Sequence, residues 1–524
     1  MLQAPANTSV ANTEQAFTPH QKPKTTQMVQ LSTDVPVHFM GIGGVGMSGL
    51  AEYLQQQGFT VSGSDAKEGA LTQWLRQLGV RVCIGHAASN LPAPSAAGQA
   101  IVVVSSAIDA QNPELLEAEA KGYTICHRSA ILKELLHGPS VGHAVSIGVT
   151  GTHGKTTTTG MIGAILAEGG MDPTVVVGGR IPGRQNNVIV SQSRTYAVAE
   201  LDESDGTLSA YAPTYTVITN LELDHPDHFQ DGEQSLLALF QGYLQNNLHA
   251  HSTQPAQVLL NADCPLTRRL GKHLPGGLSA MWISFQPEGA TDDLQQPTPA
   301  YRLTEVLANP DGTFQGTLTY QQQPIVHLRL QLPGVFNLHN AAMAAATAHH
   351  FGVPKTTIEQ ALFQFTGMGR RFEPVGRINN ALLVDDYAHH PTEVQVTLEA
   401  ARKRLGENGR LIAVFQPHRY SRFQTFWQPF LESLQAADEV YIADVYSAGE
   451  AAVPGVEAGQ FVAALQQRGR QAHHLPNDQW EAFRQNLATW LQPGDVLMTL
   501  GAGTITQLLR QLAPIGSPTN GATE

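Results

Sequence analysis

The chain has 524 residues, of which 42% are hydrophobic and 14% charged, so it can build packed cores and is not disordered throughout. Its 31 basic and 44 acidic side chains give a net charge of −13, which argues against a general nucleic-acid binder, because such proteins need a broad basic surface. The chain contains no apolar run of about 18 residues and no signal-peptide core, so we expect a cytoplasmic protein without membrane insertion.

The first predicted unit follows residues 1–34, which are rich in Thr, Gln, Pro and Asn and are expected to form a disordered tail. Strands are predicted at 37–40, 60–62 and 100–105, and helices at 48–57, 71–78 and 131–136. This alternation of strands and helices predicts an α/β domain over residues 35–138.

Two further α/β units follow along the chain. In residues 139–365, strands are predicted at 145–149, 174–177, 195–199, 216–219 and 258–260, then a β-hairpin region at 303–332 and a helix at 337–350. In residues 366–524, strands at 381–384, 411–415, 439–443 and 496–500 alternate with helices. The sequence therefore predicts three α/β domains.

The first glycine-rich loop, residues 41–49, matches GxGxxG between a strand and a helix. Such glycines permit a tight turn and let backbone N–H groups at a helix N-terminus reach a diphosphate. Asp65 ends the following strand, where a carboxylate could bind a ribose hydroxyl. Taken alone, the loop favours NAD binding, and a tight turn without a ligand is the alternative.

The second loop, Gly148 to Thr158, resembles a shortened Walker A loop and also lies between a strand and a helix. Its consecutive N–H groups can cradle phosphate oxygens, Lys155 can neutralise phosphate charge, and Thr156 can bind Mg²⁺. The loop therefore predicts that the protein binds a nucleoside triphosphate.

Acidic clusters follow two strands of the same unit, at 200–205 and 220–225. Both lie at carboxyl ends of strands, where α/β sheets bind ligands. A solvated loop is the ordinary explanation for one such cluster. Two clusters beside a phosphate loop favour a site for a hard cation.

The third unit concentrates arginine and histidine around 370–373, 385–393 and 416–423. Arg419 and Arg422 are three residues apart at the start of a helix and could face one ligand, since arginine suits phosphate or carboxylate.

Together these motifs resemble the Mur ligase family over about residues 36–512. The shared segments are GIGGVGMSGLA (41–51), GTHGKTTT (151–158), ELDESD (200–205), NLELDH (220–225), RRFE (370–373), DDYAHHPTE (385–393), FQPHRYSR (415–422), DVYSAGE (444–450) and GAGTI (501–505). The resemblance implies an N-terminal Rossmann-like domain, a central P-loop α/β domain and a C-terminal Rossmann-like domain. It also implies an ATP-dependent ligase that joins L-alanine to the lactyl carboxylate of UDP-N-acetylmuramic acid in peptidoglycan precursor synthesis.

The resemblance implies three substrate regions. The nucleotide-sugar contacts replace the NAD interpretation and would be Gly43, Gly44, Val45, Gly46, Ser64 and Asp65. The ATP contacts would be Gly151, Thr152, His153, Gly154, Lys155, Thr156, Thr157, Asn337, Asn340, Arg371 and Asp386. The amino-acid side would be lined by Tyr387, His389 and His418.

By the same resemblance, Mg²⁺, with Mn²⁺ as an alternative, would be held by Thr156, Glu200 and His225. The catalytic residues would be Lys155, His225, His389, Arg419 and Arg422. The protein would act as a monomer or weak homodimer, without nucleic acid.

The sequence departs from the family pattern at two points. Phe336 replaces a histidine of the adenine-binding segment, so the role of that histidine is not carried over. No lysine occurs between Lys155 and Lys272, so we expect no carbamoylated lysine of the kind that several relatives use. The alternatives are a sibling ligase that adds another amino acid or a recycled peptide, an NAD-dependent oxidoreductase, and a non-catalytic nucleotide-binding protein.

Overall fold

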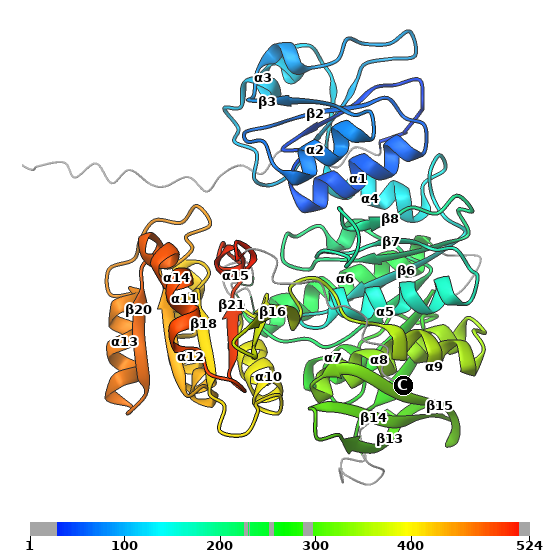
Figure 1. The fold of residues 1–524 in the computed structure, drawn as a ribbon. Coiled ribbons are helices and arrows are strands. Elements are labelled where there is room, and N and C mark those ends of the chain that lie inside the picture. The colour runs from blue at the N-terminus through cyan, green and yellow to red at the C-terminus, as the bar shows by residue number, and fades with distance from the viewer. Residues whose placement is uncertain (1–28, 225–228, 230, 251–255, 287–296, 513–524) are drawn as a thin grey trace, which may run out of the picture.

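The structure, a computed structural model, describes residues 29–224, 229, 231–250, 256–286 and 297–512. Three lobes follow one another along the chain, each built around its own sheet (Figure 1). The first lobe stands above the middle one in Figure 1, and the third lies beside the middle one. This confirms the prediction of three α/β domains. His225 lies outside the described residues, as does most of the loop expected at 286–299.

The first domain is a parallel five-stranded sheet in the order β3-β2-β1-β4-β5, which is a Rossmann-like order. Its strands are β1 (Val37–Met40), β2 (Val61–Asp65), β3 (Arg81–Ile84), β4 (Ile101–Val104) and β5 (Thr124–His127). Its helices are α1 (Val45–Gln56), α2 (Ala70–Gln77), α3 (Pro113–Ala120) and α4 (Arg128–His137). Strands β1 and β4 are buried along their whole length, as their unbroken apolar sequences predict.

The first domain begins before residue 35. Val29 and Leu31 are buried in the same apolar cluster as the core of this domain, and the Ser140 hydroxyl donates a 2.6 Å hydrogen bond to the carbonyl of Leu31. The prediction of a disordered tail over 1–34 is therefore wrong for residues 29–34, because two apolar side chains suffice to anchor the segment.

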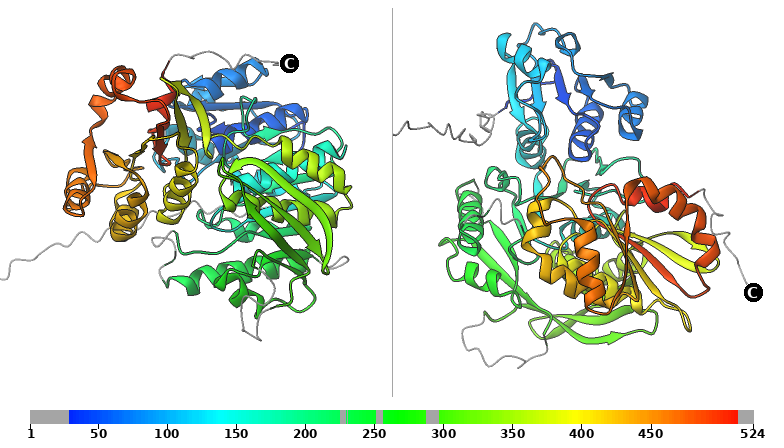
Figure 2. Two further views of the ribbon diagram at one scale, coloured as in Figure 1. Left: turned by 60° about the horizontal axis from the view of Figure 1, so that its bottom comes forward. Right: turned by 90° about the vertical axis from the view of Figure 1, so that its left-hand side faces the viewer.

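The middle domain contains a ten-stranded sheet in the order β15-β14-β13-β12-β11-β10-β6-β9-β7-β8. Its strands are β6 (Val145–Thr150), β7 (Thr174–Val176), β8 (Val188–Ile189), β9 (Tyr196–Glu200), β10 (Tyr215–Ile218), β11 (Gln257–Asn261), β12 (Ser279–Ser284), β13 (Tyr301–Ala308), β14 (Thr313–Tyr320) and β15 (Gln323–Pro333). Its helices are α5 (Lys155–Glu168), α6 (Glu233–Ala250), α7 (Pro265–Gly271), α8 (Val335–His350) and α9 (Lys355–Gln364). The region expected to form a hairpin supplies the three long strands β13 to β15, which form the end of this domain away from the first domain (Figure 2).

The third domain has a six-stranded sheet in the order β16-β17-β21-β18-β19-β20. Its strands are β16 (Glu373–Ile378), β17 (Ala381–Asp386), β18 (Leu411–Phe415), β19 (Glu439–Ala443), β20 (Gln471–Leu475) and β21 (Val496–Leu500). Its helices are α10 (Pro391–Arg402), α11 (Tyr420–Thr425), α12 (Trp427–Ser433), α13 (Ala458–Gln467), α14 (Trp480–Trp490) and α15 (Thr506–Arg510). Only β16 runs antiparallel to its neighbour among these described strands.

Within the described part of the chain, every helix is too short or too polar to cross a bilayer.

Candidate active site between the middle and C-terminal domains

The phosphate loop joins β6 to α5 at the centre of the middle sheet, since β6 lies between β9 and β10. Gly151 and Gly154 have φ angles of 120° and 83°, which glycine adopts readily and side-chain-bearing residues rarely do. A Cβ atom on Gly154 would collide with the amide of Asn340, so α8 approaches the loop closely. The loop presents its N–H groups at the N-terminus of a 14-residue helix, which favours phosphate binding.

Lys155 is the first residue of α5, and its ammonium group folds back onto the loop. Its Nζ donates to the carbonyls of Gly151 (2.7 Å) and Thr152 (3.1 Å) and forms an ion pair with Glu203 at 2.9 Å. Burial alone would lower the pKa of Lys155, but Glu203 and neighbouring carboxylates outweigh burial and raise it. Burial raises the pKa of Glu203 to about 7, against the attraction of Lys155. In this structure a carboxylate therefore holds the cation that the resemblance assigns to phosphate.

Thr156, in the first turn of α5, and Glu200, at the end of β9, lie next to the neighbouring residues Gly179 and Gly178. Glu200 ends β9, where it pairs in register with Val149 of β6, and its carboxylate accepts a 2.6 Å hydrogen bond from the N–H of Gly178. A Cβ on Gly178 would lie 2.7 Å from that carboxylate, so only glycine fits there. A hydroxyl and a carboxylate are donors that suit Mg²⁺, so these two residues fit a hard cation.

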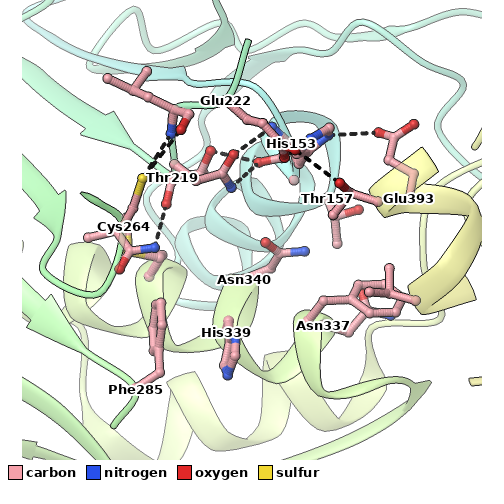
Figure 3. A pocket seen from close by; sticks show the side chains of 18 of the residues that line it. His153, Thr157, Thr219, Glu222, Cys264, Phe285, Asn337, His339, Asn340 and Glu393 are labelled. Carbon is pink, nitrogen blue, oxygen red and sulfur yellow. Dashed lines mark hydrogen bonds and ion pairs between the residues drawn. The ribbon is translucent and has the colours of Figure 1, made fainter. Parts of the chain in front are cut away.

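A cavity of about 610 Å³ lies between the phosphate loop, α8 and the third domain (Figure 3). This volume is typical of small-ligand sites, which span roughly 300–1,000 Å³. Seven of the residues that the resemblance assigns to ATP line it: His153, Gly154, Thr157, Asn337, Asn340, Arg371 and Asp386. The others, Gly151, Thr152, Lys155 and Thr156, belong to the same loop but do not line this cavity.

One end of the cavity has a flat aromatic wall that sequence reasoning missed. The rings of Phe285 and His339 stack at 4.3 Å between centroids and 8° between planes, and Figure 3 shows them side by side. Burial lowers the pKa of His339 to about 4, so its ring is neutral near pH 7. Phe336, which replaces the expected histidine, also lines the cavity. Three aromatic rings thus line a cavity that could hold a nucleobase.

Asp386 and Arg371 are two of the residues that the third domain contributes to the cavity wall. Asp386 ends β17, and its carboxylate accepts hydrogen bonds from the N–H groups of Phe372 (2.6 Å) and Ala388 (2.7 Å). Burial raises the pKa of Asp386 to about 6, although the nearby charge of Arg371 opposes this shift. Arg371 lies 3.5 Å from the carboxylate of Glu393.

His153 of the phosphate loop connects the middle domain to the third. Its Nε2 lies 2.9 Å from Glu222, and its Nδ1 lies 3.2 Å from Glu393 of α10. Burial would lower the pKa of His153, but hydrogen bonds to both carboxylates raise it to about 10, so the ring is an imidazolium ion here. Both glutamates stood in the motifs of the sequence, yet neither was assigned a role.

The three residues assigned to the amino-acid side lie together. The rings of Tyr387 and His389 meet edge-on at 5.1 Å, and those of His389 and His418 at 5.9 Å. The Nδ1 of His389 is 3.0 Å from the carbonyl of Tyr387. The guanidinium of Arg371 lies 5.3 Å from the Tyr387 ring, which places this group beside the cavity.

Arg419 and Arg422 have different partners in this structure. Arg419 precedes α11 with a φ of 65° and forms an ion pair with Glu450 at 3.0 Å. Arg422 is buried within α11 and forms an ion pair with Asp224 of the middle domain at 3.0 Å. That both arginines face one ligand therefore stays a prediction.

Asp65 binds the backbone of the first domain's glycine-rich loop: its carboxylate accepts a 2.9 Å hydrogen bond from the N–H of Gly43. Gly44 caps α1, and Val45 begins this helix with its side chain exposed. A Cβ on Gly46 would lie 2.7 Å from the guanidinium of an arginine at the start of α4. The loop therefore lies against a cation.

That cation is Arg128, which sequence reasoning also missed. It forms a 3.0 Å ion pair with Asp205, in the acidic segment that follows β9 of the middle domain. The first domain's glycine loop and the middle domain's acidic segment are thereby neighbours.

Ser64 lies in a buried polar network rather than on an open surface. Its hydroxyl donates to Glu114 and lies 3.0 Å from His86. Burial alone would raise the pKa of Glu114, but hydrogen bonds from His38, Ser64 and Asn90 lower it to about 2. No short motif marks Glu114, because its partners come from three separate segments.

Comparison with known proteins gives three family matches in succession. Residues 36–138 match "Mur ligase family, catalytic domain", residues 149–348 match "Mur ligase middle domain", and residues 370–503 match "Mur ligase, glutamate ligase domain".

The chain is also similar to individual enzymes over nearly its full length. It is 42% identical to the UDP-N-acetylmuramate–L-alanine ligase of Thermosynechococcus vestitus, over 90% of this chain and 94% of that protein. It is 36% identical to the enzyme of the same name from Syntrophotalea carbinolica, over 91% of this chain and 97% of that one. The crystal structure of UDP-N-acetylmuramate-alanine ligase from Thermotoga maritima aligns with a TM-score of 0.73 and 26% identity, covering 91% of this chain and 97% of that one. With three matching domains and close relatives along its length, the chain belongs to the Mur ligase family.

Proposed function

We propose that the protein joins the amine of L-alanine to the lactyl carboxylate of UDP-N-acetylmuramic acid, with conversion of ATP to ADP and phosphate. The observation that carries this proposal is the cavity at the phosphate loop, because its walls combine His153 and Gly154 with Arg371 and Asp386 of another domain. The names of the full-length relatives support the choice of L-alanine and of the UDP-sugar.

In the first step, an oxygen of the lactyl carboxylate attacks the γ-phosphorus of ATP. The bond from that phosphorus to the bridging oxygen breaks, and an acyl phosphate and ADP form. Both reactants are anions, so cations must offset their repulsion. Lys155 would leave Glu203 for the phosphates, and Arg371 would approach them from the third domain.

When bound, Mg²⁺ would supply further positive charge at the phosphates, and Thr156 and Glu200 are the described residues that would hold it. His225, the third residue expected to bind it, lies outside the described residues.

In the second step, the amine of L-alanine attacks the acyl carbon and phosphate leaves. The amine must first lose a proton, and His389 and His418, whose rings lie 5.9 Å apart, are the two candidate acceptors. Water would hydrolyse the acyl phosphate, so contact between the middle and third domains at His153 and Glu393 would protect it.

Phosphate release in the presence of ATP and UDP-N-acetylmuramic acid tests this function. We expect release to depend on an added amino acid and to be fastest with L-alanine, compared with glycine, L-serine, D-glutamate and a cell-wall tripeptide. Preference for the tripeptide or D-glutamate would favour a sibling ligase. Reduction of NAD without ATP turnover would refute the ligase altogether.

Because the reaction consumes ATP, we place the protein in the cytoplasm. We also propose that it acts as a monomer or weak homodimer. Mn²⁺ is the alternative to Mg²⁺, since both accept oxygen ligands.

A further inference from the structure

His390 is a buried histidine to which the proposed reaction assigns no role. It caps the N-terminus of α10, and its side chain is only 2% exposed. Neither of its ring nitrogens has a hydrogen-bond partner among the described residues. Its ring lies 4.8 Å from that of Phe426 and 5.2 Å from that of His153. A buried polar group without a hydrogen-bond partner lowers the stability of the folded state. A ligand bound to one of these nitrogens would remove that cost.

Two side chains of the middle domain lie beside His390. One ring nitrogen each from His153 and His390 and one carboxylate oxygen of Glu222 all lie within 4.8 Å of one another. The three residues come from the phosphate loop, from the segment after β10 and from the start of α10. Two imidazoles and one carboxylate form a ligand set that borderline transition metals prefer.

The neighbouring residues orient two of these ligands toward a common point. His153 Nδ1 is engaged with Glu393 at 3.2 Å, which leaves Nε2 facing Glu222. The Thr392 hydroxyl donates a 3.0 Å hydrogen bond to Glu222 Oε1. The other carboxylate oxygen, Glu222 Oε2, lies 2.9 Å from His153 Nε2 and is the one that can bind an ion together with it. A hydrogen bond donated by the far ring N–H of a ligand histidine to a carboxylate is a regular feature of metal sites.

We propose that His153, Glu222 and His390 form a binding site for a divalent transition-metal ion of the Zn²⁺ class. The ion replaces the proton between His153 Nε2 and Glu222, and a water molecule completes four-coordination. Mg²⁺ does not suit this site because two of the three ligands are nitrogen. The site shares no residue with the expected Mg²⁺ ligands, and it connects the middle domain to the third.

Titration of the full-length protein with Co²⁺, after treatment with a chelator and without nucleotide, tests this site. Co²⁺ is a suitable probe because its visible absorption reports four-coordinate binding with imidazole ligands. We expect one Co²⁺ per chain, displaced by Zn²⁺. His390→Asn and Glu222→Gln should each weaken binding at least about tenfold. His473→Asn is the matched control, because His473 is an exposed histidine on β20.

Unchanged Co²⁺ affinity in both Glu222→Gln and a folded His390→Asn would overturn the proposal. If His390→Asn fails to fold, Glu222→Gln decides alone. Loss of the signal in Glu200→Gln, with both cluster variants unaffected, would place the ion at the expected Mg²⁺ site instead. The measurement uses neither ATP nor UDP-sugar, so its failure and the failure of the proposed ligase reaction are distinguishable.

Discussion

At the scale of single residues, the pair of Lys155 and Glu203 controls the charge of the phosphate loop. The ammonium group is held 2.9 Å from the carboxylate and also donates to two loop carbonyls. Because Glu203 is buried, its charge is costly without a cation beside it. Phosphate binding would therefore exchange one anionic partner of Lys155 for another rather than expose a free cation.

We expect Lys155→Ala to lower the rate of ATP-dependent ligation by at least about a hundredfold, because charge stabilisation at the phosphates is lost. Affinity for the UDP-sugar, measured by calorimetry, should stay near that of the wild type. Lys121→Ala removes an exposed lysine of the first domain and serves as the control. An equal loss of UDP-sugar affinity in Lys155→Ala would contradict the assignment of the two substrates to different domains.

At the scale of elements, α3 is joined to the first sheet by the buried carboxylate of Glu114. The carboxylate lies 3.5 Å from His38 of β1 and accepts hydrogen bonds from Ser64 of β2 and the N–H of Ala87. Burial alone would raise the pKa of Glu114, but hydrogen bonds from His38, Ser64 and Asn90 lower it from 4.5 to about 2 in the folded state. The unfolded chain therefore binds a proton at this residue more readily than the folded chain.

This difference predicts how the stability of the first domain depends on pH. The contribution of Glu114 is fully present above about pH 4.5 and is lost as the pH falls toward 2, since the folded-state pKa is the lower one. Glu114→Gln should lower the free energy of unfolding by about 2 kcal/mol near pH 7 and weaken this acid dependence. Urea unfolding at several pH values, with Glu117→Gln on the same helix as control, measures both effects. An unchanged pH profile in Glu114→Gln would refute the role of this carboxylate.

At the scale of the whole molecule, a few charged side chains hold the third domain against the middle one. Glu393 of α10 contacts His153 and Arg371, and Arg422 forms an ion pair with Asp224. Hydrogen bonds from His153 and His389 keep the pKa of Glu393 well below its usual range, although burial opposes this. Glu393 thus carries its negative charge near pH 7, and it links the phosphate loop to the third domain.

Glu393→Gln should loosen this contact, because it removes the charge that attracts His153 and Arg371. We expect a larger radius of gyration for the nucleotide-free variant in small-angle X-ray scattering, together with a higher KM for ATP. Glu399→Gln, on the exposed side of the same helix, should leave both quantities unchanged. A variant as compact as the wild type would show that Glu393 does not hold the domains together.

Several parts of the fold were predictable from the sequence because they depend on near neighbours along the chain. The buried strand β4 reads Ile-Val-Val-Val, and the phosphate loop carries its glycines between a strand and a helix. β16 was not predicted, because Gly376 and Arg377 interrupt any apolar alternation in its six residues. The packing of Val29 and Leu31 was not predicted either, because this short apolar run directly follows a long polar segment.

The sequence by itself thus determined the three α/β units and the motifs that are expected to contact phosphate, since hydrophobic period and loop chemistry are local properties. Only the tertiary structure decided which distant side chains meet. His153 and Glu393 are 240 positions apart, and Phe285, just after β12, stacks on His339 of α8. The first pair depends on how two domains pack and the second on how one domain folds, and the spacing of residues along the chain carries no record of either.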